Sequence, residues 1–119
     1  MSILFLRLIA ECPDSSAIES VDLDARSRLQ TWHPQIDAAP APYWKLPEHV
    51  EFSYHLSPGS AEAHVAITAL EPGGWDHRNP DPDASSVWNK AGDLSFLHWR
   101  VVWAELGFVE RPGETSRGR

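Results

Sequence analysis

The stretch Ile3-Leu4-Phe5-Leu6-Arg7-Leu8-Ile9-Ala10-Glu11 constrains how the rest of the chain can be arranged. Successive side chains of a strand point to opposite sides, so apolar groups fall on both faces of this segment. Such a run is typical of a central strand that is covered on both faces. Arg7 interrupts the run, and its charge requires a carboxylate partner or a route to an end of the sheet.

Three further segments predict strands. Residues 50–56 alternate between apolar and polar side chains, which indicates one buried and one exposed face. Residues 86–89 and 94–98 predict two short strands joined by a hairpin turn at residues 90–93. Residues 100–109 predict a longer strand, with Val101 and Trp103 on one face and the other face formed by Val102, Ala104, Leu106 and Phe108.

Two segments predict helices. In residues 15–31 the apolar side chains recur at three- and four-residue spacing after the turn chemistry of Pro13 and Asp14. The second helix is expected to start in Ser57-Pro58-Gly59-Ser60, since serine is a good cap and proline is tolerated in a first turn. Residues 61–70 continue it with small and apolar side chains, and Pro72-Gly73-Gly74 ends it. We therefore expect an α+β fold with a mainly antiparallel sheet of four to five strands and two helices packed on one face. A parallel pair of strands stays open as an alternative.

The whole chain has the size of one domain, which we place at residues 1–109, followed by a flexible tail at residues 110–119. Four prolines between Pro34 and Pro47 exclude a regular helix and favour an extended connection. Within it we favour an ordered loop pinned to the body by Tyr43 and Trp44 over a recognition segment for a proline-binding partner.

Charge and composition narrow the function classes. The net charge of −7 has the wrong sign for binding nucleic acid phosphates and suits a basic protein partner. The single cysteine, Cys12, cannot form an internal disulfide, which favours a reducing compartment. No segment has the roughly 20 apolar residues of a membrane span. We expect a cytoplasmic protein with no membrane partner.

The six histidines do not form a recognisable metal-binding pattern. No His-x-x-x-His or Cys-x-x-Cys spacing is present. Asn79, Asp81 and Asp83 have the spacing that opens a calcium loop, but Ala84 and Lys90 stand where that loop needs glycine and a bidentate glutamate. We therefore expect neither a metal nor another cofactor.

Nucleophilic catalysis has little support in the sequence. Cys12 lies beside Pro13 with no histidine nearby in sequence, and free cysteine is more often a small buried side chain. Glycine-rich phosphate loops and the Gly-x-Ser-x-Gly elbow are absent. Carboxylate pairs stay open, because their spacing in sequence carries little information. We expect binding rather than catalysis.

The segment from Gly73 to Ser85 is the predicted binding loop. It is long for a connection in a compact domain, and such loops often carry function. An aromatic anchor surrounded by acids suits a basic protein partner. The alternative is that Trp75 simply closes the core. The predicted partner-binding residues, with one from the 90–93 turn, are Trp75, Asp76, His77, Asp81, Asp83 and Asp93.

Three closing segments have the sequences Ser-Val-Trp-Asn (86–89), Asp-Leu-Ser-Phe-Leu-His (93–98) and Val-Trp-Ala-Glu-Leu (102–106). Together they resemble the C-terminal end of small bacterial polymorphic-toxin immunity proteins. The likeness covers about a fifth of the chain and rests on tryptophan-rich strands. It implies a cytosolic inhibitor that neutralises a cognate toxin, for example a nuclease, by covering the toxin's active site with an acidic surface.

Two other classes stay open. A small-molecule-binding or catalytic domain would use a pocket between helices and sheet, with polar groups from Tyr54, His55 or His98. A structural subunit would form a homodimer through a tryptophan-rich surface. The sequence does not decide between a monomer and a homodimer.

Overall fold

The structure is a computed structural model that describes residues 2–78 and 84–110. Within these residues, six strands form one sheet in the order β2-β3-β1-β6-β5-β4, and every neighbouring pair is antiparallel. The strands are β1 (Ser2–Glu11), β2 (Gln35–Pro42), β3 (His49–Leu56), β4 (Trp75–Arg78), β5 (Ala84–Asn89) and β6 (Val101–Glu110). Helix α1 (Ser15–Arg28), a short 3-10 turn η1 (Gln30–Trp32) and helix α2 (Ala61–Thr68) complete the fold.

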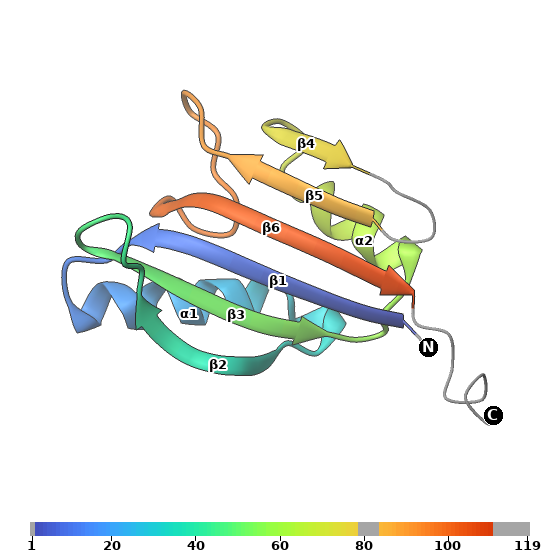
Figure 1. Ribbon diagram of the computed structural model, residues 1–119, viewed down its shortest axis with the longest axis horizontal. Helices are drawn as coiled ribbons and strands as arrows, with labels where there is room; N and C mark the ends of the chain where they lie inside the picture. Colours follow the sequence, from blue (N-terminus) through green and yellow to red (C-terminus); the bar gives the residue numbers. More distant parts are fainter. Residues whose placement is uncertain (1, 79–83, 111–119) are drawn as a thin grey trace.

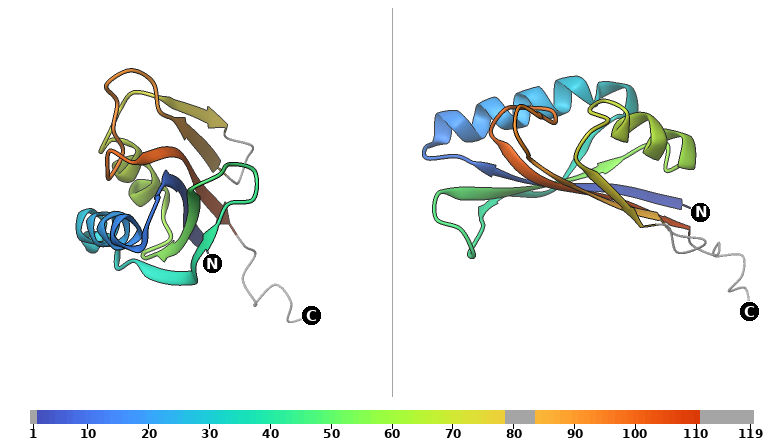
Figure 2. Two further views of the ribbon diagram at one scale, coloured as in Figure 1. Left: turned by 90° about the vertical axis from the view of Figure 1, so that its left-hand side faces the viewer. Right: turned by 90° about the horizontal axis from the view of Figure 1, so that it is seen from above.

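The predicted α+β class is confirmed, and both helices lie on the same face of the sheet (Figures 1 and 2). The sheet has six strands where four to five were expected. Strands β1 and β2 run parallel to each other with β3 between them, and β3 and β6 run parallel with β1 between them. This is the split β-α-β arrangement of ferredoxin-like topology, with the β4–β5 hairpin added beside β6.

Strand β1 lies at the centre of the sheet, between β3 and β6. Its side chains Leu4, Leu6 and Leu8 are almost completely buried on the face that carries the helices. On the opposite face neither of the two helices in the described residues covers the strand, so helices cover one face and not both as expected (Figure 2). There, Phe5 lies so close to Gly107 of β6 that a Cβ at this position would overlap the phenyl ring.

Helix α1 begins directly after Asp14, as predicted, and α2 begins at Ala61, just after the 57–60 segment that was expected to start it. The Asp14 side chain accepts a hydrogen bond from the Ala17 N–H at 2.9 Å, and the Ser60 hydroxyl accepts one from the Ala63 N–H at 3.1 Å. These caps satisfy backbone donors that have no partner inside a helix. The apolar stripe of α1 faces the sheet, with full burial of Val21 and Ala25 and of the C-cap residue Leu29.

The proline-rich segment contains strand β2, which the sequence analysis did not predict. Proline cannot donate a backbone hydrogen bond, but an edge strand has a neighbour on only one side. The pairing of β2 with β3 shifts twice, between Ile36 and Ala38 and between Ala38 and Ala41. Prolines and bulges of this kind protect an exposed edge from pairing with other chains.

The segment from Gly73 to Ser85 is not a loop throughout, because it contains strand β4 and the start of β5. Trp75 lies opposite Trp88 across this hairpin. Strand β4 has only four residues and is followed by aspartates and prolines, so its alternation is too short to be recognised in the sequence. The predicted loop residues 79–83 lie outside the described residues.

The last part of the chain differs from the prediction in two places. Residues 94–98 form no strand, and the 90–100 connection folds toward α1 with Phe96 fully buried (Figure 2). In β6 the pairing with β1 shifts between Ile9 and Ala10. Because of that irregularity Val101 is buried, as are Ala104, Leu106 and Phe108, whereas Val102 is partly exposed, as is Trp103. The prediction had placed Val101 and Val102 each on the other face. Strand β6 reaches Glu110, and the rest of the predicted tail, residues 111–119, lies outside the described residues.

Gly74 tests how closely the β4–β5 hairpin packs. It has a φ of +93°, and a Cβ there would lie 2.6 Å from Nε1 of Trp88. Gly92 has a φ of +58° with open space around it, so Gly92→Ala isolates the backbone cost. We expect Gly92→Ala to lower the free energy of unfolding by about 1 kcal/mol, and Gly74→Ala to cost roughly 1–3 kcal/mol more through overpacking. Urea unfolding measures both, and equal losses would contradict the packing.

Candidate functional site

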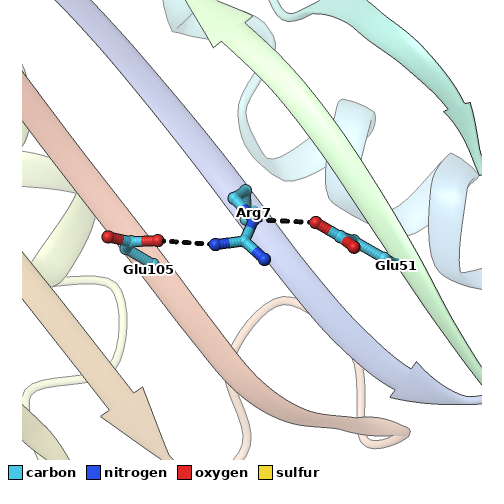
Figure 3. Close-up of polar contacts among 3 residues, drawn as sticks. All are labelled: Arg7, Glu51 and Glu105. Atoms are coloured by element: carbon cyan, nitrogen blue, oxygen red, sulfur yellow. Dashed lines mark hydrogen bonds and ion pairs between the residues drawn. The ribbon is translucent and has the colours of Figure 1, made fainter. Parts of the chain in front are cut away.

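Arg7 occupies the middle of the uncovered face of the sheet (Figure 3). Its Nε donates to Glu51 of β3 at 2.7 Å and its Nη1 donates to Glu105 of β6 at 3.0 Å. The guanidinium carbon also lies 5.4 Å from the ring centroid of Trp103, within cation–π range. The hydrogen bond that Arg7 donates to Glu51 is the main cause that raises the pKa of Arg7, while partial burial opposes it. The expected carboxylate partner is therefore confirmed, on both neighbouring strands.

A cleft of about 390 Å³ lies beside this group on the uncovered face. Most of its lining residues are aromatic or aliphatic, and Arg7 and Asn89 are the lining residues with a guanidinium and an amide. Strands β1, β5 and β6 form the floor, and the connection between β2 and β3 provides the remaining wall. The lining residues are Arg7, Ile9, Tyr43, Leu46, Asn89, Val102 and Trp103.

Residues 43–48 connect β2 to β3, and we call them the 43–48 turn. Backbone hydrogen bonds fix this turn in place. The Tyr43 N–H donates to the His49 carbonyl at 2.8 Å, and the Glu48 carbonyl accepts from the Cys12 N–H at 2.7 Å. The turn projects on the uncovered side of the sheet, whereas the 90–100 connection folds to the helix side (Figure 2). An ordered turn was predicted, and the half-buried Tyr43 lines the cleft.

Trp44 does not pin the turn, in contrast to the prediction. Its side chain is 84% exposed, the most exposed large apolar side chain in the described part of the protein. Lys45 lies over the indole, with Nζ 5.1 Å from the ring centroid. Trp99, in the 90–100 connection, is also 60% exposed, with the Arg100 guanidinium carbon 4.3 Å from its ring centroid.

The predicted anchor Trp75 packs against the core. It meets Phe96 edge-on with 5.1 Å between ring centroids, and its Nε1 donates to the Glu71 carbonyl at 2.7 Å. His77 stacks beside it at 6.1 Å and bonds through Nδ1 to the Ser86 hydroxyl at 2.7 Å. The alternative interpretation of Trp75, closure of the core, therefore has direct structural support.

Of the predicted acids, Asp76 and Asp93 lie within the described residues, and they are on different segments. Asp76 is exposed on β4, between Trp75 and His77, and strand alternation directs it to the other side of the sheet. Asp93 is exposed in the turn that follows β5. Asp81 and Asp83 lie outside the described residues. A partner-binding role for these residues stays a prediction.

Two histidines are buried on the helix side of the sheet. The Arg100 N–H donates to Nδ1 of His98 at 3.0 Å, so the neutral ring carries its proton on Nε2, 3.1 Å from the Ser20 hydroxyl. Burial is the main cause that lowers the pKa of His98, while Asp24 opposes it. His64 lies 3.2 Å from the Ser86 hydroxyl, and burial, followed by the charge of His77, lowers the pKa of His64.

No metal centre is apparent within residues 2–78 and 84–110, where no group of three potential ligand side chains comes together. Cys12 is buried, and burial raises the pKa of its thiol, which disfavours a reactive thiolate.

The residues suggested for a pocket between helices and sheet do not converge. The Tyr54 hydroxyl donates to Asp22 of α1 at 2.7 Å, and burial raises its pKa above the ordinary value. His98 bonds to Ser20 instead, and His55 lies on the opposite face beside Asp37, at 3.6 Å. The cleft described above is on the uncovered face, where the sequence analysis placed no pocket.

Some residues of this cleft are noticeable in the sequence, but the sequence does not show that they lie together. Arg7 within an apolar strand and Trp103 in the last strand both stood out, yet they are 96 positions apart and meet only through the pairing of β1 with β6. Tyr43 and Leu46 arrive from a connection whose path depends on the unpredicted strand β2.

Comparison with known protein families, with characterised proteins and with solved structures finds no match to this chain. Within the described residues, no helix combines the length and apolar character needed to cross a membrane. The fold class alone does not assign a function, since one architecture serves many activities.

The buried histidines predict a pH-dependent stability. Because their pKa values are lower in the folded state than the ordinary 6.5, the unfolded chain binds more protons below that pH. We expect the free energy of unfolding to fall as the pH decreases from about 6.5 to about 5, above the range of ordinary carboxylates. His98→Gln should flatten this slope, as measured by urea unfolding at several pH values.

The matched control is His33→Asn, at an exposed position with a φ of +49° that asparagine tolerates. It should leave the pH slope unchanged. A slope that is the same in the parent and in His98→Gln would contradict the assignment of neutral His98.

Proposed function

We propose that this protein binds another protein, as an immunity-type inhibitor that covers the active site of a basic bacterial toxin. The observation that carries the proposal is the exposure of Trp44 on a turn with a fixed backbone. Tryptophan and arginine are the residues most enriched among side chains that dominate binding energy at interfaces. The Trp44 indole, whose side chain is 84% exposed, is therefore the residue that we expect to anchor the partner.

The turn is suited to this role because little has to be ordered when a partner binds. Its backbone is already tied to β3 and to the end of β1 by the bonds of Tyr43 and Cys12. Loss of loop freedom is one of the main costs of association, so a preformed turn retains more of the interaction energy. Leu46, 42% exposed, adds apolar area beside the anchor.

The charge of the protein supports the choice of a basic partner. A net charge of −7 attracts a positively charged surface over several ångströms and speeds encounter. Nucleases present such surfaces to bind phosphates, and an acidic protein competes for them. Asp76 and Asp93, both exposed, are assigned to this steering role.

Isothermal titration with the product of the adjacent gene tests the anchor. Trp44→Ala should weaken binding by at least about 30-fold, which corresponds to about 2 kcal/mol for an interface anchor. It should leave the free energy of unfolding within about 0.5 kcal/mol, since the side chain is exposed.

The control is Trp99→Ala, which removes an exposed indole from the opposite side of the sheet and should change the affinity by less than threefold. Equal losses in the two variants would contradict the anchor. If the adjacent product does not bind and its expression without this protein leaves cells healthy, the inhibitor proposal is wrong.

Charge steering has a separate signature. Asp93→Asn should slow association, with a difference that shrinks as salt rises from 50 to 500 mM, because exposed charges act mainly through encounter. Stopped-flow association rates measure this effect. A change confined to the dissociation rate would place Asp93 in the packed interface instead.

A further inference from the structure

The cleft on the uncovered face has the features of a small-molecule site, which the proposed function does not require. Its volume of about 390 Å³ lies within the range of ligand pockets, which combine apolar walls with a few placed polar groups. Trp103 and Tyr43 supply aromatic surfaces, and Ile9, Leu46 and Val102 supply aliphatic ones. A flat, largely apolar ligand matches such walls.

The charges beside the cleft decide what kind of polar group the ligand carries. Arg7 alone would attract a carboxylate or phosphate, often through two parallel hydrogen bonds. Here two carboxylates, Glu51 at 2.7 Å and Glu105 at 3.0 Å, already surround the guanidinium. One positive and two negative charges give the group a net charge of −1, so a negatively charged ligand is disfavoured.

Hydrogen-bonding capacity remains even though the positive charge is compensated. The two ion pairs use Nε and Nη1 of Arg7, and a guanidinium has five N–H donors in total. The exposed Asn89 side chain offers both a donor and an acceptor at the same cleft. A ligand amide complements this set, because its carbonyl accepts from Arg7 and its NH₂ group donates to Asn89.

We propose that this cleft binds a neutral, planar small molecule that carries an amide-like group, and that Glu51 and Glu105 exclude anionic analogues. The aromatic body lies against Trp103 and Tyr43. The two glutamates act as specificity-determining residues without contacting the ligand, because they compensate the charge that would attract a carboxylate.

Benzamide and benzoate form a matched pair of probes, since they share size and shape and differ in charge. Titration of the ¹⁵N-labelled protein, followed by the indole N–H signals, measures binding of each. Benzamide should shift the Trp103 signal, assigned with Trp103→Phe, and benzoate should bind at least about tenfold more weakly. The proposal is overturned if benzoate binds as tightly as benzamide, or if neither probe shifts Trp103 at 20 mM.

The variant Glu51→Gln/Glu105→Gln tests the charge argument directly. It leaves Arg7 with an uncompensated charge, so the preference should reverse and benzoate should become the tighter ligand. The control Asp37→Asn removes a carboxylate that pairs with His55 rather than with Arg7, and it should keep the preference for benzamide. An unchanged preference in the double variant overturns the role of the glutamates.

Asn89→Ala provides a test that does not depend on the folding of the double variant, because Asn89 is exposed at the end of β5. We expect at least about fivefold weaker binding of benzamide and no change for toluene, which has the ring without the amide. Equal effects on both probes would show that the amide makes no contact with Asn89, and would overturn the proposed binding mode.

Discussion

Strand β1 has to place three leucines under the helices while Arg7 stays on the other side, and this requirement fixes how the neighbouring strands pair with it. Alternation along the strand permits only one arrangement, in which Leu4, Leu6 and Leu8 share the buried face. Each fully buried leucine contributes about 1.5–3 kcal/mol, whereas a half-exposed ion pair contributes about 0–1 kcal/mol. Apolar burial therefore sets the register, and the ion pairs of Arg7 follow from it.

That register determines what the uncovered face presents. It brings Glu105 directly opposite Arg7 and places Glu51 one diagonal step away on β3, opposite Ile9 (Figure 3). With both carboxylates in place, the guanidinium is held beside Trp103 and forms one wall of the cleft. A shift of the register by a single residue would turn these groups under the helices and dismantle the cleft together with the core.

The parts of the fold that followed from the sequence are those governed by local patterns. The alternation of residues 50–56, the stripe of α1 and the caps at Asp14 and Ser60 depend on neighbours a few positions away. The need of Arg7 for a carboxylate was also predictable. Strand β2 was not predictable, because prolines usually argue against a strand but are tolerated in a strand at the edge of a sheet. Whether a strand lies at the edge depends on the assembled sheet.

The candidate site was harder to predict for the same reason. The sequence does not distinguish Trp75 from Trp44, yet Trp75 packs on Phe96 and Trp44 is 84% exposed. Which indole is buried depends on β4 pairing with β5 and on the route of the 43–48 turn. The cleft likewise joins side chains from β1, β5, β6 and the turn, and only the strand order brings them together.

Trp44 and the cleft lie on the same turn-bearing face, so a protein partner and a small ligand would share one end of the molecule. We expect the proposed partner to be held through the 43–48 turn rather than through β4. The most direct measurement is a ¹H–¹⁵N spectrum of the labelled protein during titration with the adjacent gene's product. We predict shifts at the Trp44 indole and along residues 43–48, with the Trp75 indole unchanged. Shifts centred on Trp75, Asp76 and Asp93, with Trp44 unchanged, would contradict the account.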